Sequence, residues 1–153
     1  MTATMRKALV LIAIGSLVSA CSTPAGSSGT TVTATLKEWE IKLSSTSFKS
    51  GDMIFNFTNN GDKEHEFLVR KTDLAPDALP LITSGEDKGR VDEESSELTE
   101  VGTPSEIAVI PPSTTGLSLR FNLKPGHYVV FCNLHVEDLF HYTKGMHAEF
   151  TVT

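Results

Sequence analysis

The spacing of apolar residues along the chain predicts short β-strands over most of its length. In the stretch 52–60 the alternate residues Met53, Phe55 and Phe57 are apolar, which places them on one face of a strand that ends in an Asn-Asn-Gly turn. Similar stretches, separated by Gly, Pro or Asn, occur at residues 31–43, 65–71, 105–112, 115–123, 125–133 and 147–153. About seven short strands with turn signals between them predict an all-β sandwich.

One segment interrupts this pattern. From Thr72 to Thr103 the chain contains two prolines and the acidic run VDEESSELTE. We expect a long surface excursion between two strands, with room for one helical turn, and we expect its acidic side chains to be solvated. The large aromatic residues are expected to pack in the core instead: Trp39, Phe48, Phe55, Phe57, Phe121, Phe131 and Phe150.

The sequence of the N-terminus predicts an export signal. Arg6 and Lys7 precede an apolar stretch at residues 8–20 that is too short to span a bilayer, so residues 1–20 are predicted to be a secretory signal peptide. Residues 18–21 (VSAC) resemble a bacterial lipobox, in which Cys21 would carry lipid; ordinary cleavage near Ala20 is the alternative. Residues 21–31 then form a flexible tether, and residues 32–153 one globular domain outside the cytoplasm, anchored to a bacterial membrane.

Charge narrows the choice of partners. Removing Arg6 and Lys7 with the signal takes the formal net charge from −6 to −8, because residues 1–20 contain no acidic side chain. A nucleic-acid partner is therefore not expected, since phosphate binding requires a basic face. The mature chain is long enough for one domain with its own core.

The two cysteines lead to a metal site. If Cys21 carries lipid, Cys132 has no disulfide partner, and an unpaired thiol in an exported protein indicates intermolecular pairing, a reactive group or a metal ligand. His141 and Met146 follow in the spacing C-x8-H-x4-M, and a loop of this length can bring all three side chains to one point. His65, where a turn leads into a strand, is the best candidate for a fourth ligand. One thiolate, two imidazoles and a thioether are the ligands of a blue-copper site.

The chain resembles the cupredoxin superfamily, which includes plastocyanin and azurin. The resemblance rests on NNGDKEHEF (59–67) and on GHYVVFCNL…HYTKGMHAEFTV (126–152), which is similar to small cupredoxins that read roughly C-N-h-P-G-H-Y-x-x-G-M, where h is apolar. Two features depart from the family. HVEDLF (135–140) replaces a shorter Pro-Gly link, giving the ligand spacing found in copper nitrite reductases, and Glu66 stands where many cupredoxins have an asparagine that ties the ligand loops together.

The resemblance implies a fold, a cofactor and a function. The fold is a Greek-key β-sandwich or barrel of about seven to eight strands. The cofactor is one copper ion that cycles between Cu(I) and Cu(II), held by His65, Cys132, His141 and Met146. The function is single-electron transfer between extracytoplasmic redox proteins, with no enzymatic activity.

The resemblance also implies a route for the electron. We expect it to pass through an exposed edge of His141, beside an apolar patch formed by Leu139, Phe140 and Pro111. Transient docking of this kind suits an electron carrier.

Alternatives remain for the ligands. His135 would give the plastocyanin spacing C-x2-H, but five residues beyond it lies Phe140 and not a methionine, so His141 is preferred. His127 and His147 are expected at the surface, and a second metal at His135 or His147 stays open.

Alternatives also remain for the function. Copper delivery, storage or resistance would use the same ligands, but the chain has no tract rich in methionine and histidine, which favours electron transfer. A copper reductase is not expected, because Phe131 occupies the position before Cys132 where nitrite reductases have a histidine. A cysteine nucleophile would leave Met146 unexplained, and an inert sandwich would leave Cys132 without a purpose.

Overall fold

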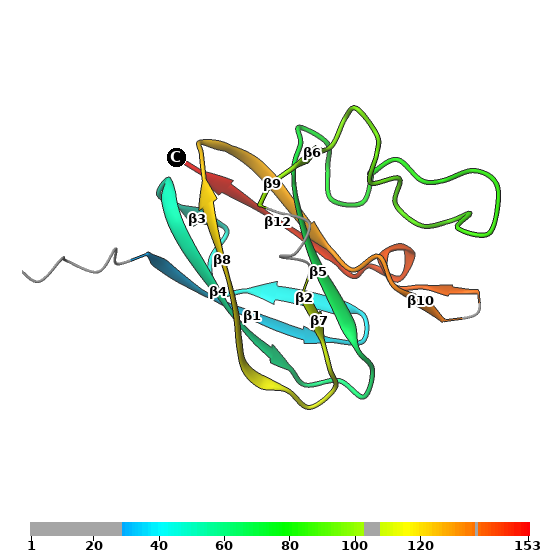
Figure 1. Ribbon diagram of the computed structural model, residues 1–153, viewed down its shortest axis with the longest axis horizontal. Helices are drawn as coiled ribbons and strands as arrows, with labels where there is room; N and C mark the ends of the chain where they lie inside the picture. The colour runs from blue at the N-terminus through cyan, green and yellow to red at the C-terminus, as the bar shows by residue number, and fades with distance from the viewer. Residues whose placement is uncertain (1–28, 103–107, 137) are drawn as a thin grey trace, which may run out of the picture.

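Two β-sheets pack face to face in the computed structural model, which describes residues 29–102, 108–136 and 138–153 (Figure 1). The expected signal peptide, Cys21 and most of the tether lie outside these residues. In the described part of the chain, no helix has the length and apolar character needed to cross a membrane. The first sheet has the order β2 (Glu40–Leu43), β1 (Thr30–Lys37), β4 (Gly51–Asn59) and β8 (Thr115–Leu123).

The second sheet contains the strands beside which the predicted ligands His65, Cys132 and Met146 lie. Its order is β3 (Ser47–Phe48), β12 (His147–Val152), β9 (Gly126–Phe131), β5 (His65–Lys71) and β6 (Thr99–Glu100), and β7 (Ala108–Ile110) pairs with β5. The β1–β4 and β3–β12 pairs are parallel, and the other pairs of both sheets are antiparallel. The all-β sandwich expected from the sequence is thus confirmed.

Individual strands agree with the apolar pattern to different degrees. Residues 65–71 and 115–123 form β5 and β8 with the expected bounds. Residues 31–43, expected as one stretch, instead form the antiparallel hairpin β1–β2, in which Lys37 pairs with Glu40 across a two-residue turn. A second short hairpin, β10 (His135–Val136) with β11 (Leu139–Phe140), was not expected, since two-residue strands leave almost no periodic signal.

Strand β9 is buried on both faces, which explains why it reads as an unbroken apolar run. Tyr128 and Val130 face the core between the sheets, whereas Val129 and Phe131 face a second cluster on the outer side. Side chains alternate along a strand, so the residue after Phe131 returns to the inner side. Cys132 therefore joins the inner core at one end of the sandwich, with no exposed surface.

The segment from residue 72 to residue 98 covers the outer face of the second sheet. It lies on the same side of the molecule as β10 (Figure 1). Its acidic side chains are largely exposed, as expected, but Leu79, Val91 and Leu98 are buried against Val129 and Phe131. Residues 72–102 contain no helix, so the expected helical turn is absent from this part of the chain. The excursion is a packed layer and not only a solvated loop.

Candidate metal centre

Three of the predicted ligands meet in one buried cluster. His65 is the first residue of β5, Cys132 directly follows β9, and His141 lies between β11 and a 3-10 turn, η2 (Tyr142–Lys144). His141 Nδ1 is 3.4 Å from His65 Nδ1 and 3.3 Å from Cys132 Sγ. One ligand atom from each residue lies within 4.8 Å of the others, and all three side chains are 1% exposed or less.

These separations fit donors that share one metal ion. Two imidazole nitrogens that are each about 2.0–2.1 Å from an ion, at a tetrahedral angle, lie about 3.4 Å apart. The two Nδ1 atoms have this separation, 3.4 Å. Both rings thus turn the same nitrogen toward a common point beside the sulfur. A thiolate with two imidazoles favours a soft or borderline ion such as copper over Mg²⁺ or Ca²⁺.

The backbone brings Met146 to the same end of the sandwich. The Cys132 N–H donates to the Met146 carbonyl at 3.1 Å, and the Met146 N–H donates to the His141 carbonyl at 3.2 Å. Met146 is fully buried and belongs to the same inner cluster as Cys132. Gly145, with φ 102°, ends the 3-10 turn in the left-handed region, a conformation that glycine adopts at little cost. This tight turn spans the stretch between His141 and Met146.

Burial keeps the Cys132 thiol and the His141 imidazole uncharged in the metal-free protein. It raises the pKa of Cys132 to about 11, although the Glu66 N–H donates to Sγ at 3.2 Å and acts in the opposite direction. Burial, followed by the neighbouring His65, lowers the pKa of His141 to about 4. Burial also lowers the pKa of His65. A metal cation would therefore displace the proton of the thiol and meet neutral imidazoles, the forms that bind metals.

Glu66 connects two of the ligand segments, although it is not the asparagine found in many cupredoxins. Its backbone N–H bonds the Cys132 sulfur. Its carboxyl group is largely buried and has a raised pKa, caused first by burial and then by repulsion from Glu93, while a hydrogen bond from the Asn133 backbone acts in the opposite direction. The backbone of Glu66, the residue after His65, is thus hydrogen-bonded to the Cys132 sulfur.

Two contacts in the turn between β1 and β2 could not be read from the sequence. The Trp39 ring packs edge-on against the His141 ring, with centroids 4.8 Å apart at 64°. Trp39 is half-buried over the ligand, so the expectation that it packs in the core was wrong. Glu38 Oε1 lies 3.5 Å from His65 Nε2 and accepts a 2.7 Å hydrogen bond from the Lys63 N–H. No local pattern marks either residue, because the contacts depend on how the two sheets stack.

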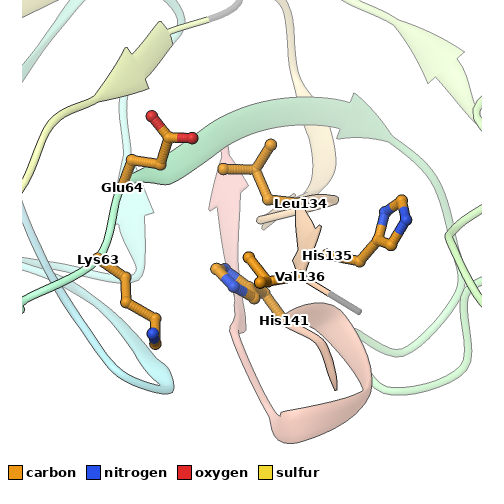
Figure 2. Close-up of a pocket in the computed structure, with 6 residues that line it drawn as sticks. All are labelled: Lys63, Glu64, Leu134, His135, Val136 and His141. Carbon is orange, nitrogen blue, oxygen red and sulfur yellow. The ribbon is translucent and has the colours of Figure 1, made fainter. Parts of the chain in front are cut away.

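The expected exposed edge of His141 is not present, because the side chain is only 1% exposed. A pocket of about 190 Å³ approaches it instead, and Figure 2 shows Leu134 and Val136 on the His141 side of this pocket, with Lys63 and Glu64 opposite. The residues expected to form an apolar patch, Leu139, Phe140 and Pro111, are not among those that line it. Part of the lining comes from β10, through His135 and Val136, so the longer loop between Cys132 and His141 forms one side of this pocket.

The other histidines lie outside the cluster. His135 is exposed, stacks on Phe140 with centroids 5.1 Å apart, and points away from His141 (Figure 2). His127, expected at the surface, is half-buried; its Nδ1 contacts the Thr72 carbonyl at 2.6 Å. His147, also expected at the surface, is half-buried with its ring centroid 5.3 Å from that of Tyr142. Neither His135 nor His147 joins a metal-binding cluster within the described residues.

Solved structures offer a comparison for the fold. No protein-family model and no curated protein matches this chain. A dithionite-reduced auracyanin from the photosynthetic bacterium Roseiflexus castenholzii is 17% identical, with a TM-score of 0.49 over 82% of this chain and 98% of that chain. Auracyanin B is 17% identical, with a TM-score of 0.49 over 86% and 91%. The multicopper oxidase McoA from Aquifex aeolicus is 14% identical, with a TM-score of 0.49 over 83% of this chain and 30% of the oxidase.

At these identities and TM-scores, function must be inferred from the residues of this chain. Its two packed sheets are an observation of its own structure, and so is the His–Cys–His cluster at one end of them. In these two respects the chain has the architecture expected from its resemblance to the cupredoxins.

Proposed function

We propose that this protein is a mononuclear blue-copper protein that carries single electrons. The observation that supports this most directly is the convergence of one ring nitrogen each from His65 and His141 with Cys132 Sγ, all within 4.8 Å of one another in a fully buried site. Met146, held beside Cys132 by a backbone hydrogen bond, would supply a fourth, weakly bound ligand through its thioether sulfur. Copper, when bound, supplies one-electron redox chemistry, since thiolate favours Cu(I) and imidazole suits both oxidation states.

The residues around the site suit an electron carrier because they hold the ligands still. The backbone of Cys132 is hydrogen-bonded to Met146, and that of His141 to Leu134. The site would therefore keep the same geometry when the metal gains or loses one electron. The site also excludes water, because Cys132 and His141 are each 1% exposed or less. Small rearrangement between two redox states is what a carrier needs, whereas an enzyme needs an open position for a substrate.

Electron exchange would take place at the pocket beside His141. Leu134 and Val136 form its apolar wall, and Val136 is 55% exposed. A redox protein that docks there would approach His141 across Leu134 and Val136 or through Trp39, whose ring packs against the His141 ring. Interfaces of this kind are small and short-lived. The net negative charge of the chain favours a partner with a basic docking face.

The N-terminal sequence supports a location outside the cytoplasm. We propose that the mature protein lies outside the cytoplasm and is held at a bacterial membrane by lipid on Cys21. Redox proteins in the same compartment would then be its partners. Mass spectrometry of the mature protein isolated from a bacterial membrane tests this, because a lipid-modified N-terminal Cys21 is expected and an unmodified N-terminus near residue 21 would contradict it.

Titration of the purified full-length protein with Cu(II) tests the copper site. An intense thiolate-to-copper absorption band at one equivalent, with a matching electron paramagnetic resonance spectrum, is expected and should be absent in Cys132→Ser. His141→Ala should lose the band, while the matched control His135→Ala should keep it, because His135 points away from the cluster. A colourless wild-type protein, or equal copper binding without Cys132, would refute the blue-copper site and favour copper storage or delivery.

A further inference from the structure

The residue directly after Cys132 is bonded to the 72–98 segment. Asn133 is 2% exposed, and its Oδ1 accepts a 2.8 Å hydrogen bond from the Val91 N–H. Its Nδ2 donates to the Val91 carbonyl at 3.1 Å and to Glu93 Oε1 at 2.8 Å. The amide of Asn133 thus pairs with Val91 as one backbone unit pairs with another in a sheet. Arg90 adds a bond from its Nε to the Asn133 carbonyl at 3.1 Å.

The residue directly after His141 is bonded to the same segment. Tyr142 is 5% exposed, and its hydroxyl accepts a 2.9 Å hydrogen bond from the Leu79 N–H. The same hydroxyl donates to the Pro76 carbonyl at 2.9 Å. The ring lies edge-on against Phe131, with centroids 6.0 Å apart at 77°. The loop that joins Cys132 to His141 is therefore fixed from outside the sandwich at two points, one near each end of the 72–98 segment.

The 72–98 segment is itself anchored to the sheet. Glu93, which accepts from Asn133, also pairs with Arg70 of β5 at 2.6 Å, and Arg70 is only 6% exposed. Leu79, Val91 and Leu98 pack against the outer side of β9. Burial of these apolar side chains removes their surface from water and stabilises the contact. The segment therefore has a rigid base from which to hold Asn133 and Tyr142.

We propose that the 72–98 segment is a clamp that sets the positions of Cys132 and His141, with Asn133 and Tyr142 as its positioning residues. This rests on the proposed copper site, because the consequence of the clamp is the geometry of the metal ligands. Each contact is made by the residue that directly follows a predicted ligand, so it acts on that ligand through the peptide bond that joins the two residues. Groups that orient metal ligands from outside affect the metal site without touching the ion. Loss of such a contact leaves a buried donor unpaired, which is costly and displaces the loop.

Tyr142→Phe tests this with a matched control in the same protein. Tyr128 is also buried, at 1% exposure, and its hydroxyl donates to the Lys124 carbonyl at 2.6 Å, away from the ligand loops near the start of β9. Both substitutions remove one hydroxyl and keep the ring, so both proteins should fold. The two readouts are amide hydrogen exchange of residues 133–146 in the metal-free full-length protein, and the absorption and paramagnetic resonance spectra of the copper-loaded protein.

Only Tyr142→Phe should change the site. Exchange across residues 133–146 is expected to rise roughly tenfold, because Tyr142→Phe removes both hydrogen bonds of the hydroxyl group. The thiolate-to-copper band and the copper hyperfine coupling should shift in Tyr142→Phe and stay as in the wild type in Tyr128→Phe. Equal exchange in the two variants would overturn the clamp whether or not copper binds. Unchanged spectra in a copper-loaded Tyr142→Phe would also overturn it. Failure of the wild type to bind copper would refute the proposed function, and the exchange comparison would still decide the clamp.

Discussion

Acidification should destabilise the metal-free protein through His141. This side chain is 1% exposed, and its pKa is lowered to about 4 by burial and by the nearby His65. In the unfolded chain a histidine binds a proton as the pH falls through about 6.5. The folded protein binds this proton only near pH 4, so the unfolded state holds more protons between these values. The stability is therefore complete above pH 6.5 and is lost as the pH falls toward 4.

The size of the effect follows from the two pKa values. Between pH 7 and pH 5 the loss from His141 is about 2 kcal/mol, and it reaches about 3 kcal/mol below pH 4. His65 acts in the same direction, because its pKa is also lowered. Glu66 acts in the opposite direction, since its raised pKa lets the folded state take up a proton first as the pH falls. A loss of about 2 kcal/mol is a large part of the 5–15 kcal/mol typical of a folded domain.

Urea unfolding of the reduced, metal-free protein at pH 7 and pH 5 measures this loss. The variant His141→Gln isolates the contribution, because it removes the titrating ring and leaves the other titratable side chains in place. The wild type should lose about 2 kcal/mol more than the variant between the two pH values. Equal losses in the two proteins would show that His141 does not carry a lowered pKa in the folded state.

Three further predictions concern the same end of the molecule. Copper uptake at neutral pH should release about one proton per ion, because Cys132 is a protonated thiol with a pKa of about 11 and His141 is already neutral. Calorimetry in two buffers of different ionisation enthalpy measures the number of protons released. Binding without proton release would contradict the prediction. Asn59→Ala should lower the free energy of unfolding by about 2–4 kcal/mol, since the buried amide of Asn59 contacts three backbone carbonyls and the Gly61 N–H. A loss below about 0.5 kcal/mol in urea unfolding would refute this prediction. Gly145→Ala should cost about 1 kcal/mol from its φ of 102° alone, because a new Cβ meets nothing closer than 3.8 Å; an unchanged melting temperature would contradict that strain.

The sequence by itself determined the local features of this protein. Alternation of apolar side chains is a property of neighbouring residues, so β4, β5 and β8 could be predicted from it. The C-x8-H-x4-M spacing is also local, because a short loop limits how far His141 and Met146 can lie from Cys132. The chemistry of these residue types then indicated copper before any distance was known.

Only the tertiary structure decided what surrounds the ligands. Trp39 packs on His141, whose side chain is buried, and the 72–98 segment is hydrogen-bonded to Asn133 and Tyr142. These contacts join residues that are far apart in the chain. Such contacts depend on the stacking of the two sheets and on the path of a long loop, which no periodic pattern encodes. A residue pattern fixes which atoms can bind a metal, whereas packing between distant segments fixes how firmly they are held and how they are reached.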